Sequence, residues 1–84
     1  MEYQSFIDAL NANAGNRLTV DVKSHHRGPV HFVVRDATPA TADLAVDFHG
    51  KLFAITSPDK KFQESIAAAL RAMHFHEDGG LLPK

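Results

Sequence analysis

The feature that most constrains this chain is the strict alternation of apolar and polar residues between positions 17 and 56. The stretch RLTVDVK places Leu18, Val20 and Val22 on one side and its polar residues on the other, and VHFVVRD continues the pattern. A period of two residues is typical of a strand with one buried and one solvated face. The middle of the chain is therefore expected to form a sheet with a single buried face.

A third and a fourth strand are expected to form a hairpin in the stretch DLAVDFHGKLFAIT. A two-residue turn at positions 49–50 would pair Val46 with Phe53 and Leu44 with Ile55. This register puts the large apolar residues of both strands on the same face. Turn-forming residues in SHHRGP separate the first two strands, and a loop at ATPATA separates the second from the third.

Two stretches with a helical period flank the strands. In residues 2–14, apolar side chains recur every three or four positions, and Gly15 suits the left-handed backbone that often ends a helix. In the second helix, Ser57 is the expected N-cap and Pro58 the first helical residue, and the glycine pair at 79–80 is expected to end it. The predicted order of elements is therefore α-β-β-β-β-α.

These elements predict one small α+β domain over residues 1–84, in which residues 76–84 can form a mobile tail. Each helix and strand has one apolar side. All of these sides are buried together if an antiparallel four-stranded sheet carries both helices on one face, as a two-layer sandwich. The opposite face of the sheet is then expected to be open to solvent or to a partner.

Composition narrows the class of function. The chain has no cysteine, which excludes disulfides, thiolate catalysis and zinc–thiolate sites. No stretch approaches the roughly 20 apolar residues that cross a bilayer, and the first residues lack the pattern of a secretory signal. We therefore expect a cytoplasmic protein without a membrane partner. The formal net charge of −1 disfavours a dedicated nucleic-acid binder, since such domains usually carry an excess of lysine and arginine.

A row of polar side chains is predicted on the open sheet face. In a simple antiparallel meander, Asp21 is expected opposite His31, and His31 opposite His49. Two imidazoles and a carboxylate are a ligand set for zinc or non-haem iron, but histidines on a solvated strand are more often polar surface. We therefore expect no metal and no cofactor. The expected binding residues are Asp21, Lys23, His31, Arg35, Asp47 and His49.

The sequence does not indicate an enzyme. Ser24 beside His25 lacks a converging acid, and the glycines are used at turns and helix ends rather than in a phosphate-binding loop. The expected function is a non-enzymatic protein-binding module, a stand-alone adaptor or inhibitor of the type that phages and mobile elements direct against host proteins. It would present its open sheet face or a strand edge to a larger protein or complex, and a sheet edge would also permit a dimer.

Two short motifs support an alternative function. The motif GPVH at 28–31 lies between the first two predicted strands, and Lys60-Lys61 begins the second helix, followed by Ala67-Ala68. In these motifs and in the order of elements, residues 6–73 resemble the double-stranded RNA-binding domain. The resemblance implies binding of duplex RNA across successive grooves. The chain departs from the family at Glu64, where the pattern has a third lysine, and in an additional predicted strand between the motifs. Under this alternative the nucleic-acid-binding residues are Arg27, His31, Lys60 and Lys61.

Overall fold

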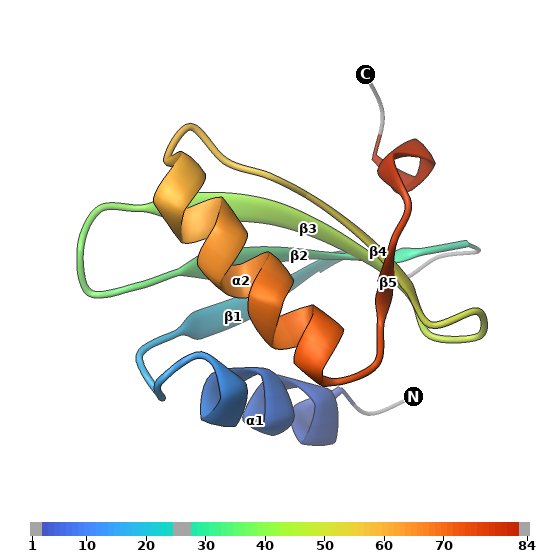
Figure 1. Ribbon diagram of the computed structural model, residues 1–84, viewed down its shortest axis with the longest axis horizontal. Coiled ribbons are helices and arrows are strands. Elements are labelled where there is room, and N and C mark those ends of the chain that lie inside the picture. Colours follow the sequence, from blue (N-terminus) through green and yellow to red (C-terminus); the bar gives the residue numbers. More distant parts are fainter. Residues whose placement is uncertain (1–2, 25–27, 83–84) are drawn as a thin grey trace.

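The computed structural model describes residues 3–24 and 28–82 of the 84-residue chain (Figure 1). Its strands form a single sheet in the order β1-β2-β3-β4-β5. The elements are α1 (Gln4–Asn13), β1 (Thr19–Ser24), β2 (Val30–Arg35), β3 (Thr41–Asp47), β4 (Leu52–Thr56), α2 (Lys60–Ala72), β5 (His76–Glu77) and a short 3-10 helix, η1 (Gly79–Leu81).

The predicted α+β class is confirmed, but the sheet has five strands rather than four. Strands β1 to β4 form an antiparallel meander, and β5 adds to β4 in the parallel direction. The backbone N–H of His76 donates to the carbonyl of Lys51 at 2.8 Å, and that of Asp78 donates to the carbonyl of Phe53 at 2.7 Å. Residues 76–82, where the sequence permitted a mobile tail, therefore form β5 and η1.

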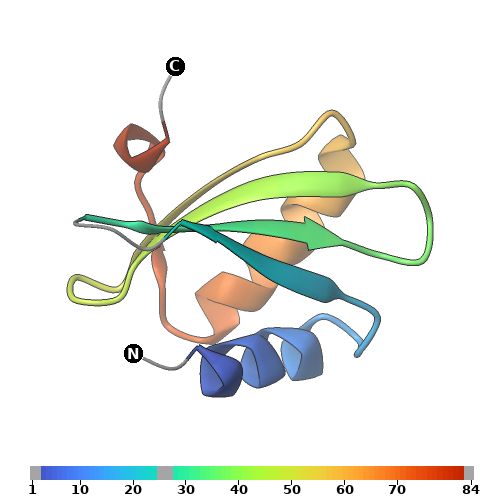
Figure 2. The same cartoon turned by 180° about the vertical axis from the view of Figure 1, so that it is seen from behind.

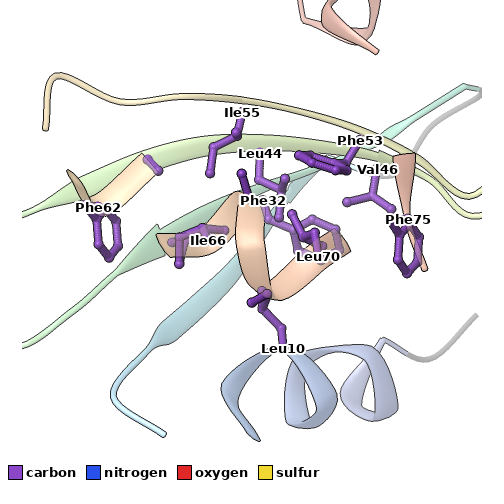
Figure 3. Packing of buried hydrophobic residues seen from close by; sticks show 14 of the residues in the cluster. Leu10, Phe32, Leu44, Val46, Phe53, Ile55, Phe62, Ile66, Leu70 and Phe75 are labelled. Atoms are coloured by element: carbon purple, nitrogen blue, oxygen red, sulfur yellow. The ribbon is translucent and has the colours of Figure 1, made fainter. Parts of the chain in front are cut away.

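Both helices cover the same face of the sheet, as predicted (Figures 1 and 2). Leu10 of α1 and Ile66 and Leu70 of α2 pack toward Phe32 and Leu44 of the sheet, and all five side chains are at most 1% exposed (Figure 3). Removing such apolar area from water contributes about 25 cal/mol per Å². This layer between helices and sheet is therefore the main source of stability in the fold.

The first helix ends where the sequence predicts. Gly15 has a φ of 91° and Asn16 a φ of 62°, and the Asn16 N–H donates to the carbonyl of Asn11 at 2.7 Å. The Asn11 side chain then reaches the chain just before β1, where it accepts from the N–H of Leu18 at 2.8 Å and donates to its carbonyl at 3.1 Å. The turn and this pair of bonds fix the direction in which β1 leaves α1.

The predicted N-cap of α2 is wrong by two residues. Asp59 is the N-cap, and its carboxylate accepts from the N–H of Phe62 at 3.1 Å. Ser57, the predicted cap, is 3% exposed and has a different role. Its hydroxyl donates to the carbonyl of Thr41 at 2.6 Å and accepts from the N–H of Asp59 at 3.1 Å. Ser57 therefore fastens the start of the helix to β3, a long-range contact that local sequence does not reveal.

The predicted end of α2 at the glycine pair is also wrong. The helix ends at Ala72, and His74 adopts the left-handed backbone with a φ of 70°. The N–H of Phe75 donates to the carbonyl of Leu70 at 3.0 Å, which closes the last turn. Phe75 is 7% exposed. Burial of this ring in the core favours a sharp reversal at His74 over a longer helix.

The strand registers were predicted correctly for one pair and wrongly for two. Strands β3 and β4 pair as expected, although their turn spans residues 48–51 rather than two residues. Asp21 lies opposite Val33 instead of His31, and His31 lies opposite Ala45 instead of His49. Both shifts are even, by two and by four positions. Because side chains alternate with a period of two, even shifts preserve the face on which each residue lies.

Candidate functional site

The sheet face opposite the helices, here called the outer face, is only partly open. The 3-10 helix η1 contacts β3 and β4 and lies on the side of the sheet away from α1 and α2 (Figure 1). Ala45 and Ala54, whose register directs them to the outer face, are 0% and 2% exposed. The small alanine side chains let the C-terminal segment approach the sheet closely. The expectation of a bare outer face is therefore wrong over β3 and β4.

The open part of the outer face centres on Val33 of β2. Asp21 of β1 and Asp43 of β3 lie directly opposite Val33 on its two sides, and His31 and Arg35 lie two residues away along β2. Val33 and His31 are half-buried, whereas the other three side chains are exposed. An apolar side chain therefore lies within a ring of charged and polar groups. We call these five residues the outer patch.

The two carboxylates of the outer patch differ in their partners. Arg35 donates to Asp21 at 2.5 Å, and about half of each side chain is exposed. An exposed pair of this kind contributes at most about 1 kcal/mol to stability. Asp43 has no hydrogen bond or ion pair with any residue that the structure describes. The charge of Asp21 is thus balanced within the chain, and the charge of Asp43 is available to a partner.

A hollow of about 400 Å³ opens beside the outer patch. The residues that line it include Lys23, His31 and Asp43, whose side chains end in an ammonium, an imidazole and a carboxylate group. Leu82, just beyond η1, supplies an apolar wall. In the described part of the chain, neither the Lys23 nor the His31 side chain has a hydrogen-bonding partner. The full lining is Lys23, Ser24, His31, Phe32, Asp43, Thr56 and Leu82.

The structure separates the residues that were expected to form one polar row. Asp21, Lys23, His31 and Arg35 share the region of the outer patch, but Asp47 and His49 do not join them. The Asp47 carboxylate accepts from the N–H of His49 at 3.0 Å and from that of Gly50 at 3.2 Å. These bonds shape the β3–β4 turn. Within residues 3–24 and 28–82, no group of three or more histidine, cysteine or acidic side chains could hold a metal ion.

The residues of the nucleic-acid alternative do not share a surface. Lys60 and Lys61 begin α2, in the helix layer, whereas His31 lies on the outer face near the start of β2. In Figure 2 the start of α2 and the start of β2 lie at opposite ends of the sheet. Arg27 falls in residues 25–27, outside the described residues, as does part of the predicted SHHRGP turn.

Five residues that line the hollow were not among the expected binding residues: Ser24, Phe32, Asp43, Thr56 and Leu82. Asp43 could have been found, since alternation in the stretch DLAVD directs it away from the buried Leu44. Thr56 ends β4 and lies opposite Asp43. The predicted register of the β3–β4 hairpin was sufficient to place Thr56 beside Asp43. Leu82 reaches the site only because the chain reverses at His74, and no local pattern predicts that path.

Comparisons with protein-family models, with curated proteins and with solved structures found no match. Among the described residues, no helix has both the length and the apolar character that crossing a membrane requires. The functional argument therefore depends on the outer patch and the hollow beside it.

Proposed function

We propose that this chain is a non-enzymatic protein-binding module, an adaptor or inhibitor that binds a larger protein through the outer patch. The observation that carries the proposal is the position of Val33. It is an apolar side chain on a helix-free face, with carboxylates on both sides and a hollow beside it. Protein interfaces commonly combine an apolar centre with a polar rim, and this arrangement fits that description.

The charges of the outer patch indicate the chemistry of the partner surface. A basic side chain of the partner would pair with Asp43, which has no partner among the described residues. An acidic group would enter the hollow near Lys23 and His31, whose side chains also have no hydrogen-bonding partner among the described residues. Between them, an apolar side chain would cover Val33. The partner is thus a protein surface with one apolar anchor flanked by charges of both signs.

The arrangement of possible catalytic groups supports a binding role over an enzymatic one. Ser24 of β1 lies opposite His31 of β2. Neither side chain forms a hydrogen bond with a described residue. An activated serine requires a base within hydrogen-bonding reach, about 2.6–3.2 Å. We also propose a cytoplasmic location, which the absence of cysteine supports.

A site-specific crosslinking experiment tests the proposal. A photoreactive amino acid replaces Val33 or, as a matched control, Ala68, which is exposed on α2 in the helix layer. Irradiation in the native host should join a polypeptide to position 33 and not to position 68. The crosslinked protein is identified and purified for direct binding measurements. No adduct at position 33, or equal adducts at both positions, would refute a role for the outer patch.

Binding of the purified partner gives the quantitative test. Val33→Arg and Asp43→Lys should each raise the dissociation constant at least about tenfold, a loss of about 1.4 kcal/mol. Ala68→Arg should leave it unchanged. If both outer-patch variants bind as tightly as the parent chain, the outer patch is not the binding surface.

The nucleic-acid alternative is tested by fluorescence anisotropy with duplex RNA and duplex DNA at low salt. We expect no binding, because the basic residues lie apart and the net charge is −1. Binding that falls steeply with salt and is lost in a Lys60→Glu/Lys61→Glu variant would replace the protein-binding proposal with this one.

A further inference from the structure

The edge of the sheet at β1 is the less protected of its two edges. The other edge is partly covered, because β5 pairs there with Leu52 and Phe53 of β4, whereas no described strand pairs with the outer side of the six-residue strand β1. Val22 of β1 is 39% exposed and is the one exposed large hydrophobic residue in the described part of the chain. An edge of this kind is a template for pairing with another strand.

Two features limit the length of edge that is free to pair. Before β1, the Asn11 side chain occupies both the N–H and the carbonyl of Leu18. After Val22, a bulge interrupts the ladder between Val22 and Ser24. Backbone groups two residues apart on a strand point the same way. Since those of Leu18 are directed to Asn11 rather than to β2, the groups of Val20 and Val22 are expected to point outward.

We propose that the β1 edge pairs with the β1 edge of a second copy of this chain, antiparallel about a two-fold axis at Asp21. Val20 of each copy then lies opposite Val22 of the other. Each of these two pairs exchanges two backbone hydrogen bonds, so the outward groups of both valines are satisfied. The exposed Val22 side chain is covered by an apolar neighbour. A two-fold axis makes the interface self-complementary and closed.

The two boundaries of the free edge determine this register. A register that places Val20 opposite Val20 would need the backbone groups of Leu18, which Asn11 already occupies. One that places Val22 opposite Val22 would extend through the bulge at Lys23 and Ser24. The register centred on Asp21 is the one that uses Val20 and Val22 and avoids both obstacles.

The charges on the outer face are consistent with a second copy as the occupant. Like charges directly opposite each other on a sheet are unfavourable, and this register places Asp21 opposite Asp21. Each carboxylate, however, already accepts from Arg35 of its own chain at 2.5 Å. The centre of the interface would therefore hold two carboxylates and two guanidinium groups, which balance. On either side, Thr19 lies opposite Lys23 of the other copy.

Single cysteines test the register directly, because the chain has none of its own. Residues directly opposite on antiparallel strands have Cβ atoms about 4.5–5.5 Å apart, close to the roughly 3.5–4.5 Å of a disulfide. Asp21→Cys should therefore form a disulfide-linked dimer under mild oxidation. The matched controls Thr19→Cys and Lys23→Cys should form little dimer alone but a mixed disulfide when combined. Crosslinking of Asp21→Cys no faster than that of Thr19→Cys would refute the register.

Sedimentation equilibrium of the unmodified chain tests the dimer itself. The mass should rise with concentration from 9.2 kDa toward twice that value. Val22→Lys should raise the dimer dissociation constant at least about tenfold, whereas Thr41→Lys, at another exposed strand position, should not. Circular dichroism verifies that both variants fold. A chain that remains monomeric at about 1 mM, or a dimer indifferent to Val22→Lys, would overturn the proposal. These measurements need no other protein, so their outcome is independent of the test of the outer patch.

Discussion

The two faces of β2 differ in what they contribute to the molecule. Phe32 and Val34 face the helices and are 1% and 0% exposed, while His31 and Val33 face outward and are half-buried. The helix side is filled by a continuous apolar cluster, whereas the outer side has a hollow whose lining includes Lys23, His31 and Asp43. Stability is therefore concentrated on one face, and residues on the other can differ without unfolding the chain. That freedom is what a recognition surface requires.

The largest change in the free energy of unfolding is expected for a substitution on the helix-facing side of the sheet. Leu44→Ala removes a fully buried side chain from β3 and should lower the free energy of unfolding by about 3–5 kcal/mol. The adjacent outward substitution Asp43→Ala should change it by at most about 0.5 kcal/mol, since Asp43 is exposed and unpaired with any described residue. Urea denaturation of both variants checks the difference. Similar losses of stability in Leu44→Ala and Asp43→Ala would mean that stability is not concentrated on the helix-facing side of the sheet.

A smaller loss of stability is expected on the outer face at Ala45, which is buried beneath η1. Ala45→Leu adds bulk beneath η1 and should cost about 1–3 kcal/mol by overpacking. It should also expose residues 79–82 to limited proteolysis. Val33→Leu, on the open part of the same face, serves as the control and should be tolerated. An Ala45→Leu variant as stable and as protease-resistant as the parent would show that the C-terminal segment does not pack against Ala45.

The smallest expected effect concerns charge on the open face. Arg35→Ala removes the partner of Asp21 and should cost at most about 1 kcal/mol, because both side chains are about half exposed. The loss should shrink at high salt, where exposed charges are screened. Arg17→Ala, at an exposed arginine without an ion pair to any described residue, is the matched control. A loss in Arg35→Ala that is large and independent of salt would indicate that the outer patch is part of the structural core after all.

The same division of faces explains how much could be predicted from the sequence. Alternation is enough to place Val33 and Asp43 on the outer face and Phe32 and Leu44 on the inner one, although Asp43 was not among the expected residues, because the period of two fixes the side on which each residue lies. It could not fix which residues lie opposite each other. Register depends on loop lengths, and β3 begins at Thr41, within the stretch that sequence assigned to a loop. The predicted row through His31 and His49 failed for this reason.

The remaining errors arose where contacts distant in sequence decide the local structure. Ser57 is a good N-cap by composition, but its bond to Thr41 of β3 leaves capping to Asp59. The left-handed residue that ends α2 is a histidine rather than either glycine at 79–80, because Phe75 must return to the core. Strand β5 has two residues and no apolar pattern of its own. Its existence follows from that reversal, which brings the chain back beside β4.

The length of β5 limits how far molecules of this kind could polymerise. Two chains joined through β1 would form one continuous ten-stranded ribbon of sheet, with a β5 strand at each outer margin. Because β5 has only two residues, His76 and Glu77, it offers few backbone groups for pairing with an additional strand. Both of its side chains are exposed and polar. In such a dimer, β5 would be a shorter template for further strand pairing than the six-residue β1 edge that the dimer covers.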